Sequence, residues 1–169
     1  MTEKKDPPSS VVGHRPMPLL IIVSGPPGSG KSTLARRIAQ ELRLPLVAKD
    51  DIKESMFDSL GWKDRKWSKQ LGRATYELMY YFAGIQLAAG KSLIVESNFN
   101  ENATPKFRVL QAKYDFVPFQ ILCYANANVL WERFTARWNS SHRHPGHVDG
   151  KISEDEFPEI CRVNSQSLD

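Results

Sequence analysis

Glycines, a lysine and hydroxyl side chains stand at the spacing that binds phosphate groups in nucleotide-binding proteins. The segment Gly25-Pro26-Pro27-Gly28-Ser29-Gly30-Lys31-Ser32-Thr33 matches the pattern G-x-x-x-x-G-K-[ST]. In this pattern the glycines let backbone N–H groups approach phosphate oxygens, the lysine reaches the β- and γ-phosphates, and the next hydroxyl binds Mg²⁺. We therefore expect the segment to bind a nucleoside triphosphate, with Lys31 on its phosphates and Ser32 on the magnesium ion.

The segments on either side of this loop are the elements that such a site needs. An apolar run, Leu19–Val23, comes directly before the loop and predicts a buried strand. A helix is expected to begin near Lys31, and the positive pole of its dipole favours a bound anion. The apolar face of this helix is expected at Leu34, Ile38 and Leu42. The alternative is a plain Gly-Pro turn between two elements, which this context disfavours.

Length and composition indicate one enzyme-sized domain. The chain has 169 residues, of which 41% are hydrophobic, and this is enough for a single core. A net charge of +4 suits anionic ligands without by itself indicating a nucleic-acid-binding protein. Cys123 and Cys161 fit neither a disulfide framework nor a metal site, and no apolar run approaches the ~20 residues of a membrane span. We therefore expect a cytoplasmic protein with no membrane partner.

The chain alternates strand patterns with helix patterns after an irregular start. Residues 1–18 have no periodic pattern and are expected to form a flexible leader, followed by one folded domain over residues 19–169. Further strands are expected at residues 44–48, 92–99 and 119–124, and further helices at residues 51–60, 68–90, 104–114 and 129–138. This alternation predicts an α/β fold with a doubly wound, mostly parallel sheet and helices on both faces.

The long expected helix has clear signals of its own. Ser68 is expected to cap its N-terminus, and Gly90 is expected to end it. Residues 62–69 before and within it alternate tryptophans with cations, a pattern that can stack a base, although packing of the tryptophans is favoured. Its apolar face is expected at Leu71, Leu78, Phe82, Ile85 and Ala89, and its aromatic residues Tyr76, Tyr80, Tyr81 and Phe82 are expected mostly in the core.

Ligands of parallel sheets bind at the carboxyl ends of the strands, so polar residues there are candidates for chemistry. Asp50 and Asp51 end the second expected strand. We assign Asp50 to orienting or deprotonating an acceptor hydroxyl, and Asp51 to helix capping or to the magnesium shell. Lys53 is expected to hold an anionic group of the acceptor. The alternative is that an aspartate here only caps the next helix.

The third expected strand also ends in a carboxylate. Glu96 follows an apolar run, and a carboxylate at this point can reach the water shell of a bound Mg²⁺. We expect Glu96 to bind the metal through water, and the alternative is a surface carboxylate paired with a lysine. Asn98 is a weaker candidate for a contact with the acceptor, and Asn126 is a further polar residue at a strand end.

Arginines gather after the fourth expected strand. Arg133 and Arg137 are four residues apart, so they lie on one face of a helix, and Arg143 follows in the next loop. Such cations can close over a triphosphate as a lid, expected at about residues 134–150, although an arginine pair can also be a solvated face. The loop also carries three histidines without a supporting metal-ligand spacing, and we expect a mobile, polar tip rather than a metal site. These histidines are His142, His144 and His147.

Together these motifs resemble a known family. The segments GPPGSGKST, KDD-I-K, E-S-N-F, R-x-x-x-R and R-H-P-G-H are similar to those of the small P-loop kinases of the AAA-type ATP-binding predicted-kinase family. Polynucleotide 5′-hydroxyl kinases, zeta-toxin kinases and chloramphenicol phosphotransferases are its relatives. The resemblance covers about residues 19–149 and implies a P-loop NTPase fold that phosphorylates a hydroxyl with ATP and Mg²⁺. It implies that Lys31 and Ser32 hold phosphates and Mg²⁺, that Asp50 activates the acceptor, and that Arg137 is the lid arginine.

The chain departs from this family pattern in two places. Relatives usually have aspartate where Glu96 stands, and they have a fifth parallel strand, for which only residues 160–163 are available here. Lys53 stands where polynucleotide kinases place an arginine for an acceptor phosphate. We expect an ATP-dependent kinase that acts on a small-molecule hydroxyl, with a nucleic-acid 5′-end as a less favoured acceptor. A module that binds ATP without transferring phosphate is the alternative, favoured by a short or irregular C-terminal end.

Overall fold

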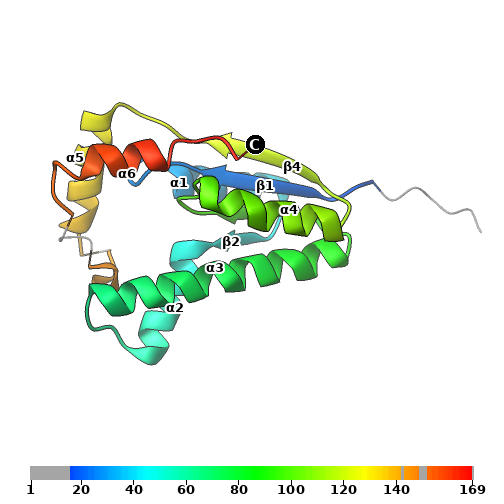
Figure 1. Ribbon diagram of the computed structural model, residues 1–169, viewed down its shortest axis with the longest axis horizontal. Helices are drawn as coiled ribbons and strands as arrows, with labels where there is room; N and C mark the ends of the chain where they lie inside the picture. The colour runs from blue at the N-terminus through cyan, green and yellow to red at the C-terminus, as the bar shows by residue number, and fades with distance from the viewer. Residues whose placement is uncertain (1–15, 142, 149–151, 169) are drawn as a thin grey trace, which may run out of the picture.

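A parallel four-stranded sheet forms the centre of the computed structural model, which describes residues 16–141, 143–148 and 152–168. The spatial order of the strands is β2-β3-β1-β4, and every neighbouring pair is parallel (Figure 1). The expected leader lies almost wholly outside the described residues. The strands are β1 (Leu19–Ser24), β2 (Leu46–Ala48), β3 (Leu93–Glu96) and β4 (Val117–Leu122).

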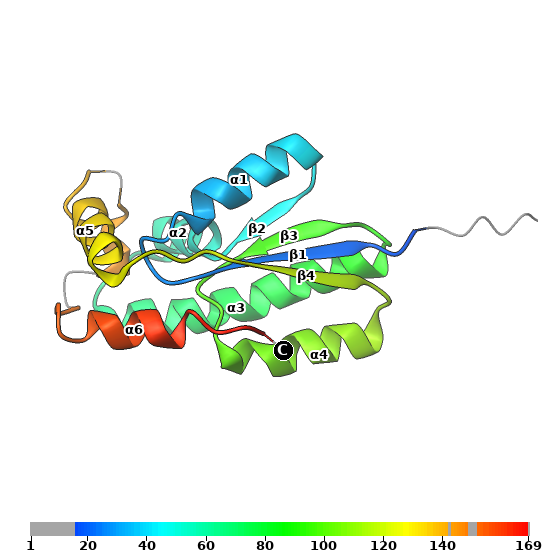
Figure 2. The same cartoon turned by 90° about the horizontal axis from the view of Figure 1, so that it is seen from above.

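Helices cover both faces of the sheet, as the alternating pattern predicted. Figure 2 shows α1 on one face and α3, α4 and α6 on the other. No helix in the described ranges is long and apolar enough to cross a membrane. The α-helices are α1 (Lys31–Leu42), α2 (Lys49–Leu60), α3 (Arg65–Ala88), α4 (Thr104–Lys113), α5 (Ala127–Trp138) and α6 (Phe157–Val163). Two short 3₁₀ helices are η1 (Glu101–Ala103) and η2 (Pro145–His147).

The apolar run of β1 forms a strand because both of its faces are buried. Leu20 and Ile22 face the core under α3 and α4, whereas Ile21 and Val23 face the smaller core under α1. A third apolar cluster joins α5 to α6 through Leu130, Phe134, Phe157 and Cys161. These three clusters hold α1 and α5 close to the segment between β1 and α1.

Helix α3 differs from the expected helix in its start and in its buried face. It begins at Arg65, because the Asp64 side chain caps it by accepting a hydrogen bond from Trp67 N at 2.8 Å. Ser68 therefore lies inside the helix and is buried, so the expected cap at Ser68 is wrong. The expected end is confirmed, since Gly90 follows the helix with a φ of 66° and donates to Leu87 O.

The buried face of α3 consists largely of small residues and not of the expected large ones. Leu78, Phe82 and Ile85 are exposed, and so is Tyr81, whereas only Leu71 of the expected apolar face is buried. Small side chains on the inner face let α3 approach the sheet and α4 closely. The buried residues are Ser68, Leu71, Gly72, Thr75, Met79, Ala83, Gly84 and Leu87.

Helices α1 and α2 also differ in detail from the expectation. In α1 the buried residues are Lys31 and Ala35, and both Leu34 and Leu42 are exposed. Helix α2 begins at Lys49, directly after β2, and Ala48 is its N-cap residue without a side-chain cap. Asp51 therefore lies in the first turn and the expected cap at Asp51 is wrong, although a carboxylate there still favours the helix dipole.

The C-terminal region is helical where a short strand was the candidate. Residues 160–163 belong to α6, so that assignment is wrong. After α6 the chain returns along β4, and the Gln120 side chain holds it by accepting from Leu168 N at 2.9 Å. Gln120 Nε2 also donates to Gln166 O at 3.5 Å and to Ser24 Oγ at 2.8 Å. The C-terminal tail is thus held by side-chain contacts, and Leu168 packs against the core under α3 and α4.

Candidate active site

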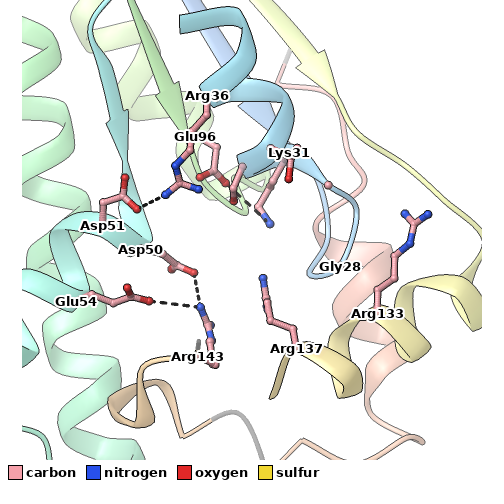
Figure 3. A pocket seen from close by; sticks show the side chains of 13 residues that line it. Gly28, Lys31, Arg36, Asp50, Asp51, Glu54, Glu96, Arg133, Arg137 and Arg143 are labelled. Atoms are coloured by element: carbon pink, nitrogen blue, oxygen red, sulfur yellow. Dashed lines mark hydrogen bonds and ion pairs between the residues drawn. The ribbon is translucent and has the colours of Figure 1, made fainter. Parts of the chain in front are cut away.

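A cavity of about 410 Å³ opens at the carboxyl ends of the strands, where α1 and α2 begin, and α5 borders it through Arg133 and Arg137 (Figure 3). It brings together most of the residues that the sequence singled out, and it adds Arg36 and Glu54. Lys53 and Asn98 are not among the residues that line it. The lining residues are Gly28, Gly30, Lys31, Ser32, Thr33, Arg36, Asp50, Asp51, Glu54, Glu96, Arg133, Arg137 and Arg143.

The loop between β1 and α1 has the backbone that a phosphate-binding loop requires. Gly25 and Gly28 have φ angles of 142° and 81°, which residues other than glycine rarely adopt. A Cβ on Gly28 would lie 2.6 Å from Leu130 O, and one on Gly25 would collide with Cys123 O. Ser29 Oγ is buried without a hydrogen-bond partner among the described residues, as fits a hydroxyl whose partner is a ligand. The loop therefore fits an anion held by backbone N–H groups.

Lys31 and Glu96 form a buried pair at the base of the cavity. Lys31 Nζ lies 4.0 Å from Glu96 Oε1 and donates to Pro26 O at 3.4 Å. Burial lowers the pKa of Lys31, which the Glu96 carboxylate raises in part, and the nearby Arg137 lowers it further. Burial raises the pKa of Glu96, against the effects of Lys31 and of a hydrogen bond from Ser32. A cation, a carboxylate and the Ser32 hydroxyl therefore meet at one point.

Asp50 faces this pair from the first turn of α2. Its Oδ2 accepts a hydrogen bond from Arg143 Nη1 at 3.0 Å, and its Oδ1 lies 3.7 Å from Lys49 Nζ. Burial acts to raise the pKa of Asp50, but Lys49 and Arg143 outweigh it and hold that pKa below its ordinary value. Asp51 instead pairs with Arg36 at 2.6 Å, and about half of its side chain is exposed. Asp50 is therefore the strand-end aspartate held in a cationic environment.

Two arginines of α5, Arg133 and Arg137, line the cavity. Figure 3 shows Arg137 pointing toward Lys31, while Arg133 lies on the outer side of Gly28. Like charges at short distance repel each other unless an anion lies between them. The facing Lys31 and Arg137 side chains therefore favour an anionic ligand in the space between them.

The segment 143–148 packs against α2 and does not form the expected polar tip. The His144 ring stacks on Phe57 with ring centroids 5.1 Å apart, and His147 meets the same ring edge-on at 5.5 Å. His147 Nε2 lies 2.7 Å from Glu54 Oε1. His142 lies outside the described residues, and within the described part of the chain no three side chains of His, Cys, Asp or Glu are grouped as a metal site.

Two predicted acceptor residues occupy other places. Lys53 is buried between α2 and α3, where its Nζ donates to Ser68 Oγ at 2.8 Å and lies 5.2 Å from the centre of the Phe57 ring. The Asn98 carbonyl oxygen lies 3.4 Å from the Tyr76 hydroxyl, outside the cavity lining. Glu54, which the sequence interpretation missed, stands four residues after Asp50 and so lies on the same face of α2. That spacing was the available signal.

This fold and this loop define a P-loop protein of the kinase type. A family model described as an AAA domain matches residues 20–152, and the chain belongs to that family. A crystal structure of a candidate kinase from Chloroflexus aurantiacus is similar to this chain, with 41% sequence identity and a TM-score of 0.78. That match covers 89% of this chain and 79% of the other. The resemblance to a small P-loop kinase family is thus confirmed.

More distant similarities agree with the fold. The cytidylate kinase of Ignicoccus hospitalis is 40% identical over 42 residues, which is 25% of this chain and 24% of the relative. The match thus spans about a quarter of the length of the curated relative. A chain of the Pnkp1/Rnl/Hen1 RNA repair complex shares the fold with 17% identity and a TM-score of 0.64, over 88% of this chain and 45% of that chain.

Proposed function

We propose that the protein transfers the γ-phosphoryl group of ATP to a hydroxyl group of a small-molecule acceptor. The observation that carries this proposal is that the phosphate-loop residues Lys31 and Ser32 line the same cavity as the Asp50 carboxylate. A nucleotide-binding protein without transfer chemistry needs the first set of residues but has no need of the second. Phosphoryl transfer needs both, because the acceptor must be held in line with the phosphate.

The loop residues 25–33 would hold the phosphates, with Lys31 on the β- and γ-phosphates and Ser32 on Mg²⁺. Bound Mg²⁺ supplies charge neutralisation at the transferring phosphate. Glu96 would bind the metal through water, which suits a carboxylate that already accepts a hydrogen bond from Ser32. This role also fits a buried carboxylate whose pKa is raised by burial, because a metal cation would stabilise its ionised form.

Asp50 would orient the acceptor hydroxyl. Its lowered pKa makes it a weak proton acceptor but keeps it ionised, so it can accept a hydrogen bond from the hydroxyl at every physiological pH. Orientation is the greater need, because little proton transfer has to precede a loose phosphoryl-transfer transition state. Arg137 would meet the charge that develops during transfer, and Arg133 of α5 and Arg143 of the segment 143–148 would be further contacts of the phosphates. We propose that one kinase domain spans residues 19–169.

The C-terminal region supports one alternative, a module that binds ATP without transfer. Residues 160–163 belong to helix α6, whereas the kinases that this chain resembles have a fifth parallel strand. The contact with the nucleotide base would therefore differ from that family pattern. The clustered Asp50, Arg137 and Arg143 favour the kinase. For localisation we propose the cytoplasm, since the thiols of Cys123 and Cys161 are both free.

A screen with γ-labelled ATP tests the proposal. The candidate acceptors are sugars, nucleosides, antibiotics and 5′-hydroxyl oligonucleotides, each compared between the wild-type protein and Asp50→Asn. We expect label transfer to one class of acceptor, and a loss of that transfer in the variant. Saturable ATP·Mg²⁺ binding with no transfer to any acceptor would leave the binding module as the correct function.

A further inference from the structure

A second cavity of about 530 Å³ lies between α3 and the segment 99–106, beyond the proposed phosphate site. Aromatic rings of Tyr76, Tyr80 and Phe99 form its walls, and Asn100 and Asn102 supply amides. Its charged residues are Arg73, Glu77 and Lys106. Apolar walls with a few polar groups are typical of sites for small organic molecules.

Tyr76 connects this cavity to Asp50. The Tyr76 hydroxyl lies 2.8 Å from Ser97 Oγ, directly after β3. Lys49 Nζ lies 5.5 Å from the centre of the Tyr76 ring and 3.7 Å from Asp50 Oδ1. Along the chain, three residues lead from Glu96 in the first cavity to Phe99 in the second, a span of about 10 Å at most. One series of contacts therefore runs from the Tyr76 ring through Lys49 to Asp50, so the aromatic cavity adjoins the proposed phosphate site.

The charges around the aromatic cavity favour an anion. Glu77 is neutralised by Lys106, whose Nζ lies 2.7 and 3.0 Å from its two carboxylate oxygens. Arg73 lines both this cavity and a neighbouring one of about 460 Å³. Within the described ranges no carboxylate lies within ion-pair distance of the cations of that neighbouring cavity. These cations are Arg65, Lys66, Lys69 and Arg73.

The clustering of these four cations in one short stretch of α3 sets them apart from exposed cations that have a carboxylate partner. Other exposed cations, such as Arg36, Arg37 and Arg162, have a carboxylate partner at 2.6 to 2.8 Å. The four cations of the basic cavity lie within nine residues of α3, about 12 Å of helix. No close ion pair within the described residues neutralises these cations, and the basic stretch begins where the aromatic walls end, at Arg73.

We propose that the aromatic cavity binds the acceptor, and that the acceptor is a small ring-bearing hydroxyl compound that also carries a phosphate group. This inference rests on the proposed kinase function and names its substrate class. The ring stacks on Tyr76 and Tyr80, the phosphate binds at Arg73, and the hydroxyl reaches Asp50. In the reaction the hydroxyl oxygen forms a bond to the γ-phosphorus, the bond from that phosphorus to the β,γ-bridging oxygen breaks, ADP leaves, and the hydroxyl proton passes to solvent beside Asp50.

Matched pairs of acceptors provide the test. Ribose is compared with ribose 5-phosphate, glucose with glucose 6-phosphate, and adenosine with adenosine 3′-monophosphate, and a 5′-hydroxyl oligonucleotide is added. Label transfer from ATP gives kcat/KM, and calorimetry without ATP gives the affinity of each compound. We expect the phosphorylated member of at least one pair to exceed its partner about tenfold or more in both measurements, the worth of one charge-assisted hydrogen bond.

Variants then locate the site. Arg73→Gln should raise KM for the phosphorylated compound about tenfold while kcat changes little, since it removes a binding contact. Tyr80→Leu should weaken binding of the phosphorylated compound, whereas Tyr80→Phe, which keeps the aromatic ring, should bind it as wild type does. Arg37→Gln removes one exposed cation of α1 and should change neither constant. The rise in melting temperature with ATP·Mg²⁺ should persist in all four variants.

Several outcomes would overturn the inference. They are equal use of both members of every pair, a phosphorylated substrate that is insensitive to Arg73→Gln and Tyr80→Leu, and no binding of any panel compound. Use of the oligonucleotide alone would replace the small molecule by a nucleic-acid end. Binding at Arg73 without any transfer would leave the cavity assignment intact and contradict the proposed kinase function, so the two failures are distinguishable.

Discussion

Arg143 donates a hydrogen bond to Asp50 at 3.0 Å across 93 residues of sequence. It joins the segment 143–148 to the first turn of α2. The same arginine lies 3.7 Å from Glu54, so one cation is shared by two carboxylates of α2. An acceptor hydroxyl that binds Asp50 must therefore share or displace this contact, and acceptor binding becomes coupled to the position of the segment 143–148.

Asp50→Asn should leave ATP·Mg²⁺ affinity near normal and slow phosphoryl transfer by about 10²- to 10⁴-fold. The amide keeps the size of the side chain but loses the charge that holds the acceptor hydroxyl. Single-turnover transfer and nucleotide affinity are the measurements. Asp51→Asn is the matched control, because Asp51 pairs with Arg36 at the exposed edge and should have only a small effect. If Asp51→Asn loses transfer and Asp50→Asn keeps it, the wrong carboxylate has been assigned.

Stability should depend on pH through Asp50. The unfolded chain takes up a proton at this residue near the ordinary pKa of 3.8, whereas folded Asp50, with its lowered pKa, stays ionised in stronger acid. Acid therefore favours the unfolded chain: the stability that Asp50 contributes is complete above about pH 5 and declines progressively as pH falls below about 4 toward the lowered pKa of the folded state. Melting temperatures should show a gap between wild type and Asp50→Asn that is widest near neutral pH and narrows in acid. A gap of constant size from neutral pH to pH 3 would contradict the lowered pKa.

Lys31→Met should abolish the rise in melting temperature that ATP·Mg²⁺ produces, with the fold retained. Methionine fills the same buried space as Lys31 but carries no charge, and burial already disfavours the charged form of Lys31. Burial also raises the pKa of the neighbouring Glu96, so Glu96 can become neutral when the lysine is removed. Thermal melts with and without ligand measure both effects. Arg37→Gln on the exposed side of α1 is the control. An undiminished ligand-induced rise in Lys31→Met would remove the lysine from the phosphate site.

Arg137→Ala should lower kcat by far more than it weakens ATP binding, because a cation that meets developing charge acts mainly in the transition state. Arg133→Ala should have a smaller effect, since Arg133 lies on the outer side of Gly28 (Figure 3). Steady-state kinetics and nucleotide titrations separate the two constants. Equal losses of affinity and rate in Arg137→Ala would show an ordinary ground-state contact.

Gly146→Ala should detach the segment 143–148 from α2. An added Cβ would lie 2.6 to 2.9 Å from ring atoms of Phe57, and that buried ring cannot yield. Because Arg143 is part of this segment, transfer should fall while ATP·Mg²⁺ binding persists. Hydrogen exchange at residues 143–148 reports the detachment. Normal exchange and normal transfer in the variant would show that the segment adapts without consequence.

Motif spacing predicted the phosphate loop and the order of strands and helices, because these depend on local pattern. The buried face of α3 was not predictable in the same way. Gly72, Thr75 and Gly84 are buried for the close approach that small residues allow, whereas Phe82 and Ile85 are exposed. Hydrophobicity alone ranks these residues in the opposite order. The sequence could not place the helix N-terminus, because Asp64 and Ser68 are of residue types that cap helices about equally well. The structure has the cap at Asp64.

The site was predictable where residues follow strand ends and was not where distant segments meet. Asp50 and Glu96 follow from the rule on parallel sheets. The packing of His144 and His147 on Phe57 joins segments about 90 residues apart, and no local pattern records it. The sequence predicts an acceptor contact for Lys53, but Lys53 lies three residues after Asp50 on α2, and its side chain contacts Ser68 instead.

The central position of β1 has a consequence for the newly made chain. Its neighbours come late in the sequence, since contacts of β1 with residues beside β3 and in β4 span 73 and 96 residues. Until β3 is synthesised, the apolar run of β1 has both hydrogen-bonding edges unpaired, a state in which chains associate with one another. Lys31 also gains its partner Glu96 only when β3 docks. Folding should therefore be slow and limited by these non-local pairings, and chaperone demand should be highest while residues 25–92 are being made.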